Sequence, residues 1–174
     1  KLYCEAFPAY ERKPFSMIRS MQKKGTSDVW YFEKDGTFAG LAFTINSDNV
    51  ILIDYLAIAA DRRGEGIGSA IITQLRNYYE DKGIFVEIES VFDECRNIDE
   101  RLRRKHFYLN NGMVPMKVMV ILFGVKMELL GIKEADINSL MEGDLFKIRV
   151  IHSEKKIMKE ELTLAEKEMI KRIE

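Results

Sequence analysis

A strand-like run that leads into a glycine-rich turn and then into a helix constrains the fold more than any other part of this sequence. Residues 53–59 read Ile-Asp-Tyr-Leu-Ala-Ile-Ala, and the turn Arg63-Gly64-Glu65-Gly66-Ile67-Gly68 follows shortly after. From Glu65 to Lys82, apolar side chains recur every three or four residues, which is the period of an amphipathic helix. A strand, a short turn and a helix in this order favour an α/β fold with a parallel crossover.

The turn has the properties of an anion-binding site. Glycines let the backbone approach a ligand closely, and the free N–H groups of the first helical turn point toward it. Arg62 and Arg63 add full positive charges. The spacing lacks the Gly-Lys-Ser or Gly-Lys-Thr end of a triphosphate loop, and it has no Gly-x-Gly-x-x-Gly directly after the strand. A pyrophosphate bound without magnesium therefore fits this turn best.

The surrounding sequence predicts a mixed sheet flanked by helices. Short helical segments precede Gly25, and strands at 29–33, 38–46 and 50–58 are expected to form an antiparallel meander with a tight turn at Lys34-Asp35-Gly36. Residues 84–90 form the next strand, parallel and adjacent to 50–58. We expect a second helix at 99–110 and strands at 117–123 and 125–130, which gives six or seven mostly antiparallel strands.

Beyond residue 130 the pattern is weaker. A helix at 134–141, a strand at 146–151 and a charged helix at 160–173 are expected. No repeat or linker separates this part from the rest. We therefore treat residues 1–174 as one domain, with 131–174 as an extension of it.

Composition excludes several classes of protein. The chain has 27 basic and 28 acidic residues, so it has no global field that would attract nucleic acid or an anionic membrane. The basic residues at 101, 103, 104 and 105 are interpreted as a solvated helix face. Cys4, Cys95 and two isolated histidines resemble neither a disulfide framework nor a metal site. Reduced thiols and the lack of an apolar span favour a cytoplasmic protein without a metal.

Two motifs resemble those of the GNAT superfamily of N-acetyltransferases. The family signature reads Gln or Arg, two variable residues, Gly, one variable residue, then Gly or Ala, and Arg63, Gly66 and Gly68 match it in register. Residues 103–113 (Arg-Arg-Lys-His-Phe-Tyr-Leu-Asn-Asn-Gly-Met) resemble the later family motif, in which a helix carries Phe-Tyr before a glycine. The resemblance covers roughly residues 29–130, and residues 6–12 are similar to the start of a bacterial subgroup.

The resemblance implies acetyl-coenzyme A as cosubstrate, bound without a metal. In this family the strand before the turn splays from its parallel neighbour, and the pantetheine arm lies in the gap as an added strand would. The pyrophosphate then lies on the turn. The cofactor-binding residues implied in this chain are Leu56, Ala57, Ile58, Arg63, Gly64, Glu65, Gly66, Ile67, Gly68 and Ser69.

The resemblance also implies direct attack by an amine on the thioester, without a covalent enzyme intermediate. An alkyl amine with a pKa of about 10.4 is mostly protonated at neutral pH, so a carboxylate, or a water hydrogen-bonded to one, should remove a proton. Asp54, Glu87 and Glu89 lie near the expected acetyl position, and we select Glu89 and Asp54 as the base candidates. Tyr108 matches the family's general acid by position, and the Leu56 amide is the expected oxyanion donor.

The expected acceptor is a primary amine, either a small molecule or a protein lysine or N-terminus. The carboxylates near the site favour a cationic amine, and the late apolar strands leave a homodimer open. Two alternatives share the same cofactor motif. One is a non-catalytic coenzyme A-binding or regulatory module, and the other is an acyltransferase that uses a different acyl-coenzyme A.

Overall fold

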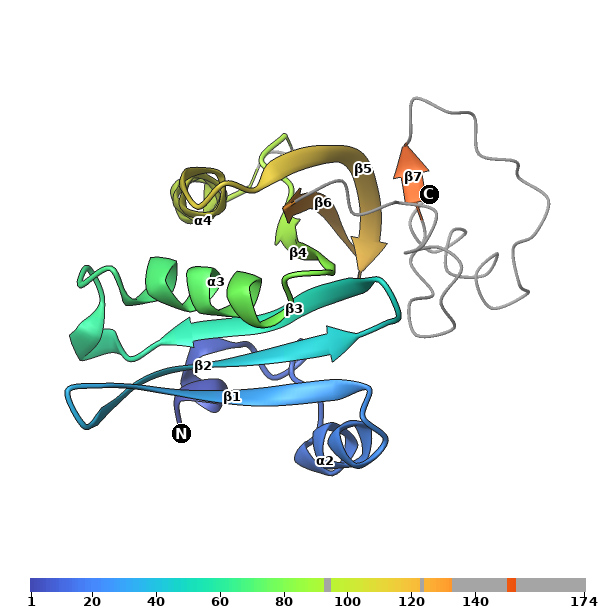
Figure 1. Ribbon diagram of the computed structural model, residues 1–174. Coiled ribbons are helices and arrows are strands. Elements are labelled where there is room, and N and C mark those ends of the chain that lie inside the picture. Colours follow the sequence, from blue (N-terminus) through green and yellow to red (C-terminus); the bar gives the residue numbers. More distant parts are fainter. Residues whose placement is uncertain (93–94, 123, 133–149, 153–174) are drawn as a thin grey trace.

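The computed structural model describes residues 1–92, 95–122, 124–132 and 150–152, and its strands form one mixed sheet in the order β1-β2-β3-β4-β6-β5-β7 (Figure 1). Only β3 and β4 are parallel, and the other neighbours are antiparallel. The predicted mixed α/β fold is confirmed. The strands are β1 Ser27–Lys34, β2 Thr37–Asn46, β3 Val50–Ile58, β4 Gly83–Glu89, β5 Val114–Leu122, β6 Val125–Ile132 and β7 Val150–His152.

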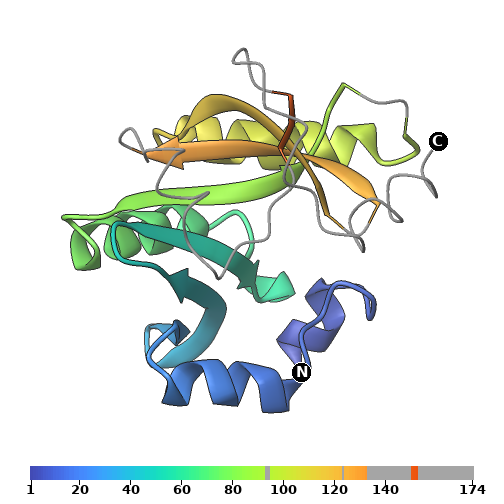
Figure 2. The same cartoon turned by 90° about the vertical axis from the view of Figure 1, so that its right-hand side faces the viewer.

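Helices cover both faces of this sheet (Figures 1 and 2). The larger core cluster joins Ile71 and Leu75 of α3 and Tyr108 of α4 to one face of the strands. Tyr3 of α1 and Ile18 of α2 pack with Phe43 and Tyr55 on the opposite face. The helices are α1 Leu2–Ala6, α2 Phe15–Lys23, α3 Ile67–Tyr78 and α4 Ile98–Asn110, with a 3₁₀ turn η1 at Ala60–Arg62.

The helix predicted at 65–82 is shorter in the structure, where α3 ends at Tyr78. Tyr79 leaves the helical conformation, and its hydroxyl bonds to Thr44 Oγ1 at 2.8 Å and Asp28 Oδ2 at 2.6 Å on the sheet. The chain therefore turns toward the sheet one turn early. Gly83 begins β4 and its amide donates to Asn49, so it does not cap the helix.

The predicted C-terminal elements fall mostly outside the described residues. The helices expected at 134–141 and 160–173 lie wholly outside them. The strand expected at 146–151 overlaps β7, which pairs with β5 at the end of the same sheet.

Ion pairs attach α4 to the strands beneath it. Arg101 and Arg104 both contact Glu89 of β4, and Lys105 contacts the Glu128 carboxylate of β6. Glu128 is only 5% exposed, and its other oxygen accepts the Val91 amide at 3.0 Å. The interpretation of this basic run as a solvated face is therefore wrong for Arg101 and Lys105, because the sheet carries buried carboxylates that one helix alone does not reveal.

The Lys105–Glu128 pair gives a test of this attachment. Lys105→Met should lower the free energy of unfolding by about 3–5 kcal/mol, because it leaves a carboxylate buried without its cation. Adding Glu128→Gln should recover much of that loss, since the amide oxygen still accepts the Val91 N–H. Urea denaturation measures the free energy of unfolding of the single and the double variant, with the exposed Arg103→Met as the control on the same helix. If Lys105→Met were as stable as the control Arg103→Met, this role for the pair would be contradicted.

Candidate active site

The candidate site begins where β3 and β4 separate. The two strands pair over only three residues, from Val50 with Gly83 to Leu52 with Phe85, and then run apart (Figure 1). At the same point β3 contains a bulge, because Phe43 pairs with Tyr55 and Thr44 with Ile53, which leaves Asp54 unpaired. A bulge bends its strand and increases the local twist. In the described part of the chain, the edge of β3 that faces β4 therefore has no strand partner beyond Leu52.

The direction of the backbone groups along this edge can be derived from one hydrogen bond. The Ala59 amide donates to the Ala39 carbonyl at 2.9 Å, so it points toward β2. Backbone groups alternate in direction along a strand paired on one side. The amides of Leu56 and Ile58 therefore point away from β2, into the space between β3 and β4. The Ala57 amide points toward β2, although Ala57 is also one of the residues that line the cleft.

The glycine-rich turn lies at the end of this open edge. Gly64 and Gly66 have φ of 83° and 75°, a region that L side chains rarely adopt, and Gly66 is the N-cap of α3. The amides of Ile67, Gly68 and Ser69 belong to the first helical turn and have no partner within the helix. They are placed to donate hydrogen bonds to an anion.

Of the charged side chains in the turn, Arg63 lines the cleft. Arg62 instead binds Glu65, with Nε 2.9 Å from Oε1, and Lys34 Nζ reaches the second Glu65 oxygen at 3.0 Å. The Glu65 side chain therefore forms ion pairs with Arg62 and Lys34, and Glu65 is not among the residues that line the cleft. Its backbone is the part of this residue that lies in the turn.

Gly68 joins the two motifs that the sequence analysis identified. A Cβ atom at this position would lie 3.0 Å from two ring atoms of Phe107 in α4. The absence of a side chain at Gly68 therefore permits α3 to pack closely on the helix that carries Tyr108.

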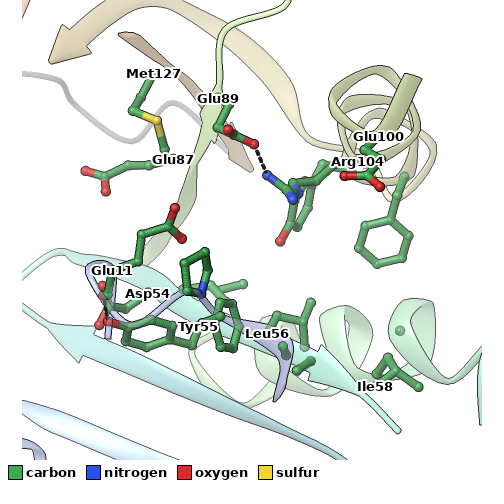
Figure 3. Close-up of a pocket in the computed structure, with 18 of the residues that line it drawn as sticks. Glu11, Asp54, Tyr55, Leu56, Ile58, Glu87, Glu89, Glu100, Arg104 and Met127 are labelled. Carbon is green, nitrogen blue, oxygen red and sulfur yellow. Dashed lines mark hydrogen bonds and ion pairs between the residues drawn. The ribbon is translucent and has the colours of Figure 1, made fainter. Parts of the chain in front are cut away.

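These elements enclose a cleft of about 820 Å³ (Figure 3). It includes every residue of the predicted site except Glu65: Asp54, Leu56, Ala57, Ile58, Arg63, Gly64, Gly66, Ile67, Gly68, Ser69, Glu89 and Tyr108. Sequence reasoning missed the contribution of the N-terminal segment, which we define as residues 7–14. Phe7, Tyr10, Glu11 and Lys13 of this segment line the cleft. Only the resemblance of residues 6–12 to a family subgroup pointed to it.

The N-terminal segment is held in place through Tyr55. The Tyr55 hydroxyl donates to the Glu11 carbonyl at 2.6 Å and accepts the Lys13 amide at 3.1 Å. Burial raises the pKa of Tyr55 above its usual value, with further increases from the Tyr3 hydroxyl and the Asp54 charge, although the hydrogen bond from the Lys13 amide lowers it. Tyr55 therefore stays protonated and serves as a bridge between β3 and the segment.

Three cleft carboxylates differ in their cationic partners. Both Asp54 oxygens lie 2.8 Å from Lys13 Nζ, and the Glu89 oxygens lie 3.2 Å from Arg101 and 2.7 Å from Arg104. The Glu87 carboxylate has no hydrogen bond or ion pair with any residue in the described ranges, although its backbone belongs to the β4–β6 ladder. In Figure 3, Glu89 reaches toward Arg104, whereas Glu87 lies on the side nearer Glu11 and Asp54.

Burial also sets the protonation of these groups. It raises the pKa of Glu87 to about 7, with a further increase from the Asp54 charge and a decrease from Lys13. Burial raises the pKa of Asp54 as well, against the lowering effect of Lys13. Glu87 is therefore poised to exchange a proton near neutral pH, without a cation bound to it in the described structure.

Tyr108 lines the same cleft from α4 and is 8% exposed. Burial raises the pKa of its hydroxyl to about 12, although the nearby Arg104 charge lowers it. The hydroxyl is therefore protonated across the physiological range and can donate a hydrogen bond into the cleft.

Among residues 1–92, 95–122, 124–132 and 150–152, no group of three His, Cys, Asp or Glu side chains could hold a metal ion. No helix in the same ranges is long and apolar enough to cross a membrane.

The sequence model of the acetyltransferase (GNAT) family matches residues 1–108, and the chain belongs to this family. Its sequence is 33% identical over 106 residues to the Bacillus subtilis protein YjbC, which is provisionally named as an acetyltransferase. The match covers 59% of this chain and 53% of YjbC, so the chain spans about half the length of this curated relative.

Solved structures show the same fold. A protein from Bacteroides thetaiotaomicron, provisionally described as a GNAT acetyltransferase, is 18% identical with a TM-score of 0.65, over 80% of this chain and 84% of that one. The spermidine N-acetyltransferase of Vibrio cholerae, solved with coenzyme A and spermine, is 13% identical with a TM-score of 0.55, over 71% of this chain and 79% of that one. Acetyl-coenzyme A is the acetyl donor of the family.

A glycine substitution tests whether the turn binds coenzyme A. Gly66→Val should abolish detectable binding of coenzyme A in calorimetric titration, because the branched side chain is strained at φ 75° and displaces the amides of the first α3 turn. Gly36→Val is the matched control, since Gly36 has φ 71° in the β1–β2 turn and lies outside the cleft lining. Unchanged affinity of the Gly66 variant would remove the phosphate-site assignment.

Proposed function

We propose that this protein transfers the acetyl group of acetyl-coenzyme A to a primary amine by direct attack. One observation carries this proposal. The open edge of β3, the first turn of α3, Glu87 and Tyr108 all line a single cleft. A donor bound along the strand and a base for the acceptor are thereby brought together in one space.

The backbone supplies most of the proposed binding of acetyl-coenzyme A. Its pyrophosphate would lie on the amides of Ile67, Gly68 and Ser69, with Arg63 adding a positive charge. Its pantetheine arm would run along β3 and bond to the Ile58 backbone. The thioester oxygen would meet the Leu56 amide, whose fixed direction stabilises the developing oxyanion without reorganisation.

We propose Glu87 as the base, ahead of Asp54 and Glu89. The other two carboxylates already have cations on their oxygens, whereas Glu87 has none among the described residues. With a pKa of about 7, Glu87 is partly ionised at neutral pH and holds an accepted proton well. It would remove a proton from the acceptor ammonium, directly or through a water, before the C–N bond forms.

Tyr108 would assist the departure of coenzyme A as the C–S bond breaks. The pKa of a thiol is about 8.5, so a hydroxyl with a pKa of about 12 would not surrender its proton fully to a free thiolate. Donation of a strong hydrogen bond to the sulfur as charge develops is the role that these values favour. The acceptor ammonium gives up two protons in forming the amide: Glu87 takes the first before the attack, and the second leaves the nitrogen as the tetrahedral intermediate collapses and neutralises the departing sulfur, so that coenzyme A leaves as the thiol.

The acceptor end of the cleft favours a small cationic amine. Glu11, Asp54 and Glu87 all line this end, and Lys13 compensates only one negative charge among them. The comparison structure from Vibrio cholerae was solved with spermine, a cationic amine of this kind. These observations support an amine that is positively charged in solution and is deprotonated before it attacks the thioester.

Replacing Glu87 tests the base. Wild-type kcat/KM should rise through a pH of about 7 as Glu87 ionises, and Glu87→Gln should lower kcat by about 10²-fold or more and remove that limb. Release of the coenzyme A thiol measures the rate. Glu33→Gln, on the exposed side of β1, is the control. A Glu87→Gln enzyme with the wild-type pH profile would refute this assignment.

Replacing Tyr108 tests the donor to the sulfur. Tyr108→Phe should reduce kcat by about 10²-fold, while the dissociation constant for coenzyme A stays within about twofold of wild type. Single-turnover kinetics and calorimetry separate the two effects. The exposed Tyr31→Phe should change neither quantity. Full activity of Tyr108→Phe would assign the role to another group.

A further inference from the structure

We propose that Lys13 and Asp54 act as a positioning pair, which fixes the N-terminal segment over the acceptor end and balances the charge beside Glu87. The pair would act through Glu87 and need not touch the reacting atoms. This inference rests on the proposed function, because it takes Glu87 as the base.

The geometry of the pair is well defined at both partners. Lys13 Nζ lies 2.8 Å from Asp54 Oδ1 and Oδ2, and 5.3 Å from the centre of the Tyr55 ring. The Lys13 and Asp54 side chains are 26% and 13% exposed, so the pair is largely shielded from solvent. Asp54 is also the bulge residue at which β3 departs from β4, which places the pair at the start of the cleft.

Lys13 is anchored at its backbone as well as at its ammonium. Its amide donates to the Tyr55 hydroxyl at 3.1 Å, and its carbonyl accepts the Tyr3 hydroxyl at 3.2 Å. Tyr3 and Tyr55 in turn meet edge to face, with ring centroids 5.0 Å apart. A lysine side chain normally loses much conformational entropy when it forms an ion pair. Here two hydrogen bonds fix the Lys13 backbone, so the ion pair does not also have to order the main chain.

The other charged groups near Glu87 are mostly engaged elsewhere. They are Glu11 from the N-terminal segment and Glu89 from β4, whose oxygens contact Arg101 and Arg104 of α4. On β6, Glu87 pairs with Leu129, so Lys126 and Glu128 lie on the other face of the strand, where Glu128 contacts Lys105. Lys126 also has an interaction of its own. Tyr55 and Tyr108 remain protonated. Asp54 and Lys13 are the two groups whose charges act on the Glu87 carboxyl, and they act with opposite signs.

Removing one member of the pair should therefore shift the pKa of Glu87 in a predictable direction. Lys13→Met leaves the Asp54 charge uncompensated and raises the pKa of Glu87, so activity appears only at higher pH. Asp54→Asn leaves the Lys13 charge uncompensated and lowers that pKa, so activity extends to lower pH. The double variant removes both charges and should return the pKa close to its wild-type value. A merely structural role would not produce shifts of opposite sign.

The test measures Glu87 directly in the full chain. Carbon-13 NMR titration of the side-chain carboxyls, with the Glu87 signal assigned by its loss in Glu87→Gln, gives its pKa without any turnover. We expect an increase of about one unit in Lys13→Met and a decrease of similar size in Asp54→Asn. Lys13→Arg keeps the cation and should preserve the wild-type value. Lys34→Met removes the cation of another lysine–carboxylate pair, Lys34–Glu65, and should leave the pKa of Glu87 unchanged.

Failure of this inference and failure of the proposed function give different results. A Glu87 pKa that is unmoved in both variants, or that moves in the same direction in both, would overturn the positioning pair. The expected opposite shifts, combined with a Glu87→Gln enzyme that acetylates 1,4-diaminobutane at the wild-type rate, would keep the pair and reject Glu87 as the base. The same pH shifts should appear in kcat/KM for 1,4-diaminobutane, with KM for acetyl-coenzyme A unchanged.

Discussion

The separation of β3 from β4 is the constraint on which the rest of the site depends. After three paired residues, the bulge at Asp54 bends β3 while β4 continues to pair with β6. A strand edge inside a sheet normally satisfies its N–H and C=O groups with a neighbour. Here the groups of Leu56 and Ile58 are left for a ligand, and the same bend directs the strand into the glycine turn. The cofactor site that we propose thus depends on an interruption of the sheet.

Neighbouring cations give different environments to two carboxylates, Glu87 and Glu89, that look equivalent in the sequence. Glu87 and Glu89 share one face of β4, but α4 brings two arginines to Glu89 and none to Glu87. Glu89 thereby becomes part of the attachment of α4. Arg101, Lys105 and Tyr108 recur at intervals of four and three residues, so the ion pairs and the cleft hydroxyl occupy the same side of the helix. The buried charges on one side of α4 therefore set the position of Tyr108.

Local patterns predicted the parts of the fold that depend on local interactions. The turn at Lys34-Asp35-Gly36 and the start of α3 follow from glycine positions and apolar periodicity, whereas the splay of β3 from β4 was implied by the family resemblance. The end of α3 was predicted wrongly, because Tyr79 bonds to residues 35 and 51 positions away. The Lys13–Asp54 contact spans 41 residues and has no local signature either. Alternation placed the carboxylates on one face but could not show which of them had cations.

The two ends of the cleft are built from different kinds of interaction. The end proposed for coenzyme A uses backbone groups and glycines, which tolerate little change because side chains would fill the space or strain the turn. The end proposed for the acceptor uses side chains of the N-terminal segment, which is held by contacts with Tyr55 and Asp54. Substitutions among residues 7–14 can therefore alter charge and shape around the amine without disturbing the donor site. Acceptor preference should follow this segment, independently of the glycine motif by which the family is recognised.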